Sequence, residues 1–258
     1  MTPQCRDIRK NILTASRASG HGHIPTTFSI IEMLCAVYDT MKHDPKNPQW
    51  PERDIFILSK GHAALGLYST LEHYGYLQMD ELKTYGSFGS RLGCHSDRMK
   101  VPGVEWSTGS LGHGIAAAVG IALAFKIQNS PRRVFTLIGD GESNEGSVWE
   151  SVMVAANLKL SNLTILYDNN GSQIRSLPIP NPTERFKAFL CETHEVNGHD
   201  LDAIKSVLAK PAKTIKMVVC NTVKGYGSTT LSNNIFEWHR KSPDPQQFEQ
   251  FLKELEAA

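Results

Sequence analysis

Polar residues that can bind a metal ion follow two apolar segments of this chain. The run VFTLI is followed directly by Gly139-Asp140-Gly141, and the run LTILY is followed by Asp168-Asn169-Asn170. Short continuous apolar runs are typical of buried parallel strands, and ligands bind at the carboxyl ends of such strands. We therefore expect Asp140 and Asn170 to lie at one edge of a sheet. A carboxylate and an amide oxygen there suit Mg²⁺, which takes few protein oxygens and completes its octahedron with water and substrate phosphates.

The surrounding sequence alternates between strand and helix patterns. Apolar residues at helical spacing predict a helix over 147–159, between the two apolar runs. Further helices are predicted over 6–18, 29–41, 63–74, 79–85, 112–127, 183–190 and 201–209, and strands over 54–58, 134–138, 163–167 and 215–220. This alternation predicts an α/β fold with a doubly wound, mostly parallel sheet and helices on both faces. The helix at 112–127 is apolar nearly all round, so we expect it to be buried, and residues 86–105 form a long loop of the kind that is usually functional.

The segment from Gly139 to Asn170 resembles the thiamine diphosphate signature, which is GDG, a helix, and a strand that ends in Asn. It is most similar to transketolases whose two halves are separate chains, through GDGESNEGSVWE and LSNLTILYDNNGSQI. The resemblance implies the diphosphate-binding (PP) domain of these enzymes, with Gly139 and Gly141 beside the cofactor. It also implies that Asp140 and Asn170 supply side-chain oxygens to Mg²⁺, that Ser172 supplies its backbone carbonyl, and that the metal holds the diphosphate.

A second segment, GVEWSTGSLGHG, resembles the family pattern GVE-x-x-TGPLGQG. The resemblance places Gly109, Ser110 and Leu111 against the cofactor. Ser110 stands where the family has proline, and Arg175-Ser176 stands where it has Asp-Gly. These departures fall in substrate-facing loops while the metal unit is intact, so they favour retained cofactor chemistry with an altered substrate. Drift in tolerant loops is the alternative.

Several histidines lie in loops rather than on apolar helix faces. The resemblance maps four family histidines onto His21, His62, His95 and His239, and it gives no role to His23. It implies that His62 and His95 lie near the reacting carbon and the substrate hydroxyls, with His62 also touching the cofactor and with His21 and His239 at the aldehyde side. Imidazole can donate to a developing alkoxide and accept protons from hydroxyls near neutral pH.

The resemblance runs from about Arg6 to Lys253 and stops where the family's pyrimidine-binding domain would begin. We expect residues 1–258 to be a single domain that binds thiamine diphosphate and Mg²⁺. The missing domain, with the glutamate that activates the cofactor, is expected on a separately encoded partner chain in a two-fold symmetric α2β2 assembly. Glu145 and Glu150 would face a subunit interface, and the substrates would be sugars or sugar phosphates.

Composition excludes several other classes of protein. Lys and Arg total 27 against 26 Asp and Glu, so neither nucleic acid nor an anionic membrane is indicated as a partner. The five cysteines are scattered and form no CxxC pair, as is typical of reduced thiols in a cytosol. The polar N-terminus does not resemble a signal peptide, and no apolar stretch approaches the roughly 20 residues of a membrane span. We expect a cytoplasmic protein.

The leading hypothesis is a transketolase-type transferase that moves a two-carbon ketol unit from a ketose to an aldose and is active only with its partner. The α chain of a 2-oxo acid dehydrogenase shares the GDG unit, but His21, His62 and His95 are not expected in that family. An enzyme like 1-deoxyxylulose 5-phosphate synthase normally keeps both domains in one chain. An inactive scaffold or regulatory subunit would have no reason to retain Asp140 and Asn170.

Overall fold

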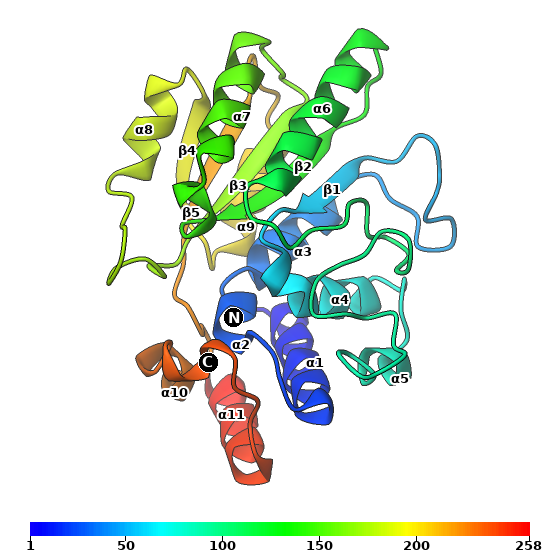
Figure 1. The fold of residues 1–258 in the computed structure, drawn as a ribbon, viewed down its shortest axis with the longest axis vertical. Helices are drawn as coiled ribbons and strands as arrows, with labels where there is room; N and C mark the ends of the chain where they lie inside the picture. Colours follow the sequence, from blue (N-terminus) through cyan, green and yellow to red (C-terminus); the bar gives the residue numbers. More distant parts are fainter.

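Five strands form one sheet in which every neighbouring pair is parallel (Figure 1). The structure is a computed structural model that describes residues 1–258. The strand order is β1-β2-β3-β5-β4, so the chain crosses over β5 to reach the edge strand β4 and then returns. The strands are β1 (Ile55–Leu58), β2 (Val134–Gly139), β3 (Leu163–Asn169), β4 (Glu192–Asn197) and β5 (Lys216–Asn221).

Helices cover both faces of the sheet, which confirms the predicted fold class. One face carries α6 (His113–Ile127), α7 (Gly146–Asn157) and α8 (Pro182–Ala188), and the other carries α3 (Ile31–Thr40) and α9 (Leu201–Ala209). Side chains of a strand point to alternate faces. Ile55 and Ile57 of β1 accordingly belong to the apolar cluster beneath α6 and α7, whereas Phe56 and Leu58 belong to the cluster on the side of α3 and α9.

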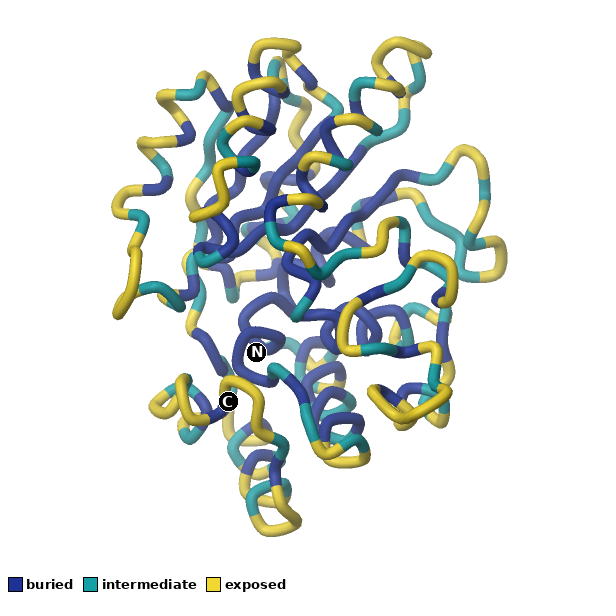
Figure 2. Tube along the Cα trace, viewed as in Figure 1, coloured by how far each residue is buried: buried dark blue, intermediate teal, exposed yellow.

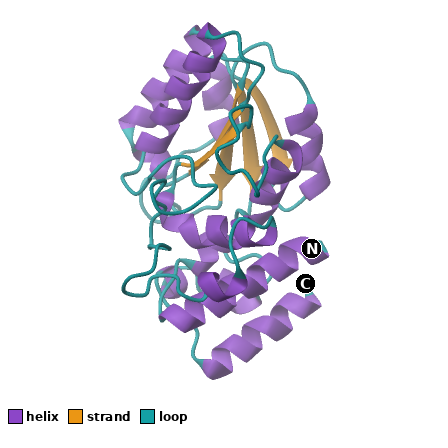
Figure 3. Cartoon of the chain, turned by 90° about the vertical axis from the view of Figure 1, so that its right-hand side faces the viewer, coloured by secondary structure: helices purple, strands orange, loops and turns teal.

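The remaining helices gather beyond the carboxyl edge of the sheet, in the lower half of Figures 1 and 3. This layer consists of α1 (Pro3–Ser19), α2 (Ile24–Phe28), α4 (Ala64–His73), α5 (Met79–Leu82), α10 (Thr229–Asn233) and α11 (Pro245–Ala257). Residues 86–105 contain no helix or strand, as predicted. None of the helices combines the length and the apolar character that a membrane span requires.

The prediction that the apolar helix at 112–127 is buried was wrong for one side of α6. Ile115, Ala118 and Ala122 face the sheet, but Ala116, Gly120 and Ala124 are exposed (Figure 2). Hydrophobicity all round a helix indicates that every side is suited to burial. It does not say which elements of the same chain are available to cover each side.

Three segments for which the sequence predicted neither a helix nor a strand contain regular structure. The edge strand β4 reads ETHEVN and is only partly buried, so it lacks the apolar run that identifies a buried strand. The short helix α2 begins in the glycine- and histidine-rich loop that separates two predicted helices. The helix α11 carries a capping box between Asp244 and Gln247, a local signal that marks the start of a helix.

Candidate active site

A polar cavity lies at the carboxyl ends of β1, β2 and β3, where the sequence predicts the ligand site. Its volume is about 280 Å³, near the lower end of the range for small-molecule sites, and Leu111 is its single hydrophobic lining residue. A lining of this kind suits a charged ligand. The cavity is formed by His23, Thr26, Lys60, His62, Gly109, Leu111, Gly139, Asp140, Gly141, Glu142, Asn170, Ser172, Gln173, Lys224, His239 and Arg240.

Asp140 follows β2 and presents a buried carboxylate to this cavity. Two backbone amides orient it, because Gly141 N donates to Oδ1 at 2.7 Å and Gln173 N donates to Oδ2 at 3.3 Å. Burial raises the pKa of Asp140, and the neighbouring Asp168 carboxylate raises it further. The site therefore holds a negative charge that its surroundings do not fully balance, and a bound cation would stabilise it.

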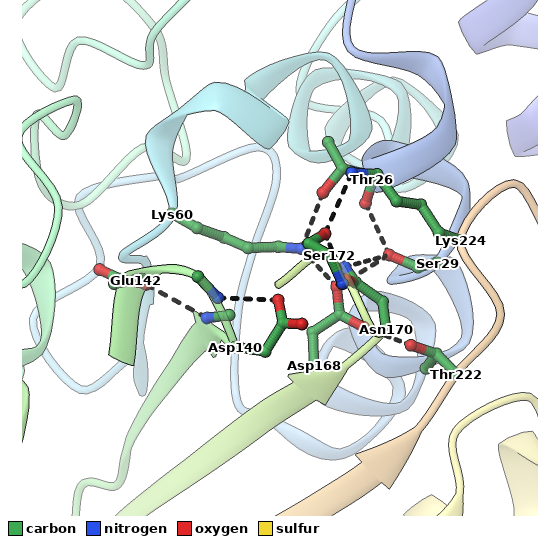
Figure 4. A network of polar contacts seen from close by, with 12 residues as sticks. Thr26, Ser29, Lys60, Asp140, Glu142, Asp168, Asn170, Ser172, Thr222 and Lys224 are labelled. Carbon is green, nitrogen blue, oxygen red and sulfur yellow. Dashed lines mark hydrogen bonds and ion pairs between the residues drawn. The ribbon is translucent and has the colours of Figure 1, made fainter. Parts of the chain in front are cut away.

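Asn170 and Ser172 lie beside Asp140 in the loop that follows β3 (Figure 4). The amide nitrogen of Asn170 donates to Asp168 Oδ2 at 2.6 Å, which leaves its Oδ1 on the side of Ser172 and the cavity. Ser172 N donates to this oxygen at 2.9 Å. The chain contains no cluster of three or more His, Cys, Asp or Glu side chains that could hold a metal. The predicted site is of another kind, with one carboxylate, one amide oxygen and one carbonyl, and these residues fit Mg²⁺ with phosphate and water completing the octahedron.

Cationic side chains surround the predicted metal-binding residues. Lys60 comes from the turn after β1, Lys224 from the loop after β5, and Arg240 from the segment before α11. Lys224 Nζ donates to Ser172 Oγ at 3.0 Å, and burial together with the charge of Lys60 lowers the pKa of Lys224. The cavity therefore has cationic groups that can balance the charge of a diphosphate.

Three histidine rings meet on the other side of the cavity. The ring of His23 lies 5.6 Å from that of His62 and 5.2 Å from that of His239, centroid to centroid. Burial lowers the pKa of His62 to about 2, with Lys60 adding to the effect, and burial followed by the charge of His239 lowers the pKa of His23 to about 4. Both rings are therefore neutral near pH 7, so each has one nitrogen that donates and one that accepts.

His23 was expected to have no role, and the structure places it among the cavity residues. His21 does not line the cavity; its ring packs on Tyr85 at 5.2 Å and lies 3.7 Å from the thiol of Cys94. The sequence contains two successive Gly-His pairs, Gly20-His21 and Gly22-His23, and the resemblance takes His21 of the first pair as the family histidine. The helix α2 begins directly after His23 and directs the second pair toward the cavity.

The other predicted residues divide between the cavity and its surroundings. His62, Gly109, Leu111, Gly139, Asp140, Gly141, Asn170, Ser172 and His239 line the cavity. His95 lies at its rim, where a Cβ atom on Gly109 would meet Cδ2 of the His95 ring at 3.4 Å. Ser110 is exposed and does not line the cavity, and Glu145 and Glu150 are exposed at the start of α7.

Sequence reasoning missed a set of buried charged residues that shape the cavity. Glu142 accepts from the backbone amides of Gly112 and Gly139 at 2.9 and 3.3 Å, so it joins the two glycine loops beneath the cavity. Lys60, Asp168 and Lys224 were also missed. Lys60 and Asp168 adjoin recognised motifs, in SKGH and DNN, but their types alone do not show that they are buried.

The lowered histidine pKa values predict that acid destabilises the protein. Unfolded histidine takes up a proton as the pH falls below about 6.5, whereas His62 and His23 in the fold do not, so the free energy of unfolding decreases between pH 6.5 and 5. We expect His62→Asn to reduce this decrease, as measured by thermal unfolding at pH 7.5 and 5.5. His73→Asn, at an exposed site at the end of α4, is the control. Equal pH dependence in wild type and His62→Asn would contradict the assignment.

Comparison with known proteins identifies the family of this chain. The family model described as "Transketolase, thiamine diphosphate binding domain" matches residues 5–239. An apulose-4-phosphate transketolase subunit from Actinobacillus succinogenes is 38% identical over 96% of this chain and 92% of its own length. The 6-deoxy-6-sulfo-D-fructose transketolase subunit SqwG of a Clostridium species is 38% identical over 88% of this chain and 86% of its own length.

The structural comparison agrees with the sequence comparison. A transketolase variant from Pichia stipitis matches with a TM-score of 0.88 at 29% identity, over 96% of this chain and 39% of that longer chain. The match to the family model covers most of the chain, and the predicted metal-binding residues, the glycine loops and the histidines fall within it. The chain therefore belongs to the transketolase family of thiamine diphosphate-dependent transferases, as that family's thiamine diphosphate-binding domain.

Proposed function

We propose that this chain is the diphosphate-binding subunit of a two-chain enzyme that transfers a two-carbon ketol unit from a ketose to an aldose. The observation that carries the proposal is the buried Asp140 carboxylate beside the Asn170 amide oxygen, in a cavity lined by Lys224, His62 and Arg240. Asp140, Asn170 and the carbonyl of Ser172 would hold Mg²⁺, and the cationic and imidazole groups would bind the diphosphate. Thiamine diphosphate, when bound, supplies the carbon that carries the ketol unit.

The histidines would hold and move protons on the substrate. His23, His62 and His239 surround one side of the cavity, and His95 lies at the rim. The neutral rings of His62 and His23 can donate to a carbonyl that becomes an alkoxide and accept from a hydroxyl group. Because His23 lies beside His239, we assign to His23 the aldehyde-side position that the sequence resemblance gives to His21.

A separately encoded partner chain carrying the pyrimidine-binding domain would complete the site. The two relatives of nearly equal length are named as transketolase subunits, which supports this division. Ile174 and Leu177 are 72% and 66% exposed in the loop beside the cavity, and Met153 and Val154 are exposed on α7. These exposed apolar groups are available for contact with a partner chain. We propose an α2β2 assembly in which Glu145 and Glu150 face a subunit interface.

The substrate proposed for this site carries an anionic group. Arg240 is exposed at the cavity and forms no ion pair, and Arg175 is held 4.3 Å from the ring centre of Phe236 in the neighbouring segment. The names of the two relatives refer to a phosphorylated and a sulfonated sugar. A guanidinium group binds either anion through paired hydrogen bonds, so both sugar phosphates and sulfosugars are suitable test substrates.

The test is reconstitution with the partner subunit, thiamine diphosphate and Mg²⁺. We expect no turnover from the highly purified chain alone, and ketol transfer from a ketose to an aldose once the partner is added. The same mixture should not decarboxylate a 2-oxo acid. Ketol transfer by this chain without a partner would refute the two-chain proposal, and activity on 2-oxo acids alone would favour the dehydrogenase alternative.

A further inference from the structure

A fully buried carboxylate lies behind the candidate metal site and does not line the cavity. Asp168, at the end of β3, is 0% exposed. Its Oδ2 accepts from Ser29 Oγ at 2.8 Å and Asn170 Nδ2 at 2.6 Å, and its Oδ1 accepts from Thr222 Oγ1 (Figure 4). These neutral donors satisfy its hydrogen-bonding capacity but leave its charge unbalanced.

Lys60 supplies the balancing charge. It is 1% exposed, and its Nζ donates to Asp168 Oδ2 at 2.5 Å and to Thr26 Oγ1 at 3.2 Å. Lys60 comes from the turn after β1 and Asp168 from the end of β3, and these two strands flank β2 in the sheet. Removing one partner of a buried ion pair leaves an uncompensated charge, whereas replacing both with neutral residues is often tolerated.

The pair fixes the direction of the Asn170 amide. With Nδ2 toward Asp168, the Asn170 oxygen faces Ser172 and the cavity. The reverse orientation would bring the Asn170 oxygen within 2.6 Å of a carboxylate oxygen, which is repulsive. Replacing a residue that orients a metal ligand in this way typically lowers metal affinity or activity about 10–100-fold.

We propose that Lys60 and Asp168 are a positioning pair for the metal–diphosphate site. Asp168 orients the Asn170 oxygen toward the metal, and Lys60 neutralises Asp168, so that this second carboxylate remains a hydrogen-bond acceptor and does not turn toward the cation. The inference rests on the proposed function, since it concerns the same metal. It assigns both residues a role that acts through Asn170.

A competing role for Lys60 is direct contact with the diphosphate, because its side chain also borders the cavity. The two roles give opposite results for a double variant. If Lys60 acts through Asp168, replacing both with neutral residues restores the charge balance, and the side chain introduced by Asp168→Asn still has an oxygen that can accept from the Asn170 amide. If Lys60 binds the diphosphate, the double variant remains as impaired as the single one.

The experiment is calorimetric titration of this chain, assembled with its partner subunit, with thiamine diphosphate at saturating Mg²⁺, together with thermal unfolding of each variant. We expect Lys60→Met to weaken binding about 10–100-fold and Lys60→Met/Asp168→Asn to recover to within a few-fold of wild type. Lys60→Arg, which keeps the charge, should stay close to wild type. Lys216→Met is the matched control, because Lys216 is a lysine of β5 that is also buried but donates only to backbone carbonyls at the end of α9.

Four outcomes would overturn the proposal. A double variant that binds as weakly as Lys60→Met would show direct contact with the diphosphate. If the single variant does not fold, a double variant that binds about 10–100-fold more weakly than wild type shows the same. A loss of thermal stability in Lys60→Met at unchanged affinity would show a purely structural pair. Absence of binding in wild type would overturn both this role and the proposed cofactor site, whereas binding that is lost in Asp140→Ala but kept in Lys60→Met would overturn the positioning role alone.

Discussion

Asp140→Ala is expected to abolish magnesium-dependent binding of thiamine diphosphate. A methyl group can neither ligate Mg²⁺ nor offset the charge of the diphosphate–metal complex. Asn170→Ala should weaken binding in the same direction but less, because it removes a neutral ligand. The measurement is the calorimetric affinity of the assembled enzyme for thiamine diphosphate at fixed Mg²⁺, with Asp202→Ala at an exposed position of α9 as the control.

The stability of the Asp140 variants provides a second readout that separates loss of a ligand from loss of the fold. The pKa of Asp140 is raised by burial and by Asp168, so its charged form destabilises the ligand-free protein near pH 7. Asp140→Asn should therefore unfold at the same temperature as wild type or a higher one while it loses cofactor affinity. Unchanged affinity in Asp140→Ala would remove the basis for the metal assignment.

His23→Ala is expected to lower turnover by about 10²–10⁴-fold, the usual contribution of a general acid–base group. The ring of His23 lies among those of His62 and His239 in the cavity, whereas the ring of His21 packs on Tyr85 beyond it. His21→Ala should therefore change turnover little. The measurement is steady-state kinetics of the assembled enzyme with saturating cofactor, so that weakened cofactor binding does not enter the comparison.

The variants of His21 and His23 test directly which of the two Gly-His pairs acts in the cavity. We expect His62→Ala to lower turnover by about as much as His23→Ala, because the ring of His62 meets that of His23 in the cavity. A large loss in His21→Ala with normal turnover in His23→Ala would return the role to the first Gly-His pair. It would also imply that the loop moves substantially when the substrate and the partner bind.

The sequence by itself determined the parallel sheet and the placement of Asp140 and Asn170 at one edge of it. The apolar runs of β2 and β3 are buried on both faces, and burial of this kind leaves continuous hydrophobic residues that are visible without a structure. Asp140 and Asn170 follow these two adjacent strands, which are joined by one helix. A single strand–helix–strand connection is enough to bring them together, so local patterns predict the contact.

Only the tertiary structure decided which distant side chains join that unit. Lys60 and Lys224 arrive from β1 and β5, and Arg240 and His239 from the segment before α11, so their meeting depends on the packing of the whole sheet and the helical layer. Which of His21 and His23 lines the cavity is also decided by the tertiary structure, because two identical dipeptides in one loop differ only in where the following helix directs them. Local residue types indicate helix or strand propensity and the spacing of apolar residues. Burial, charge pairing and the direction of a loop depend on contacts between segments that are far apart in the sequence.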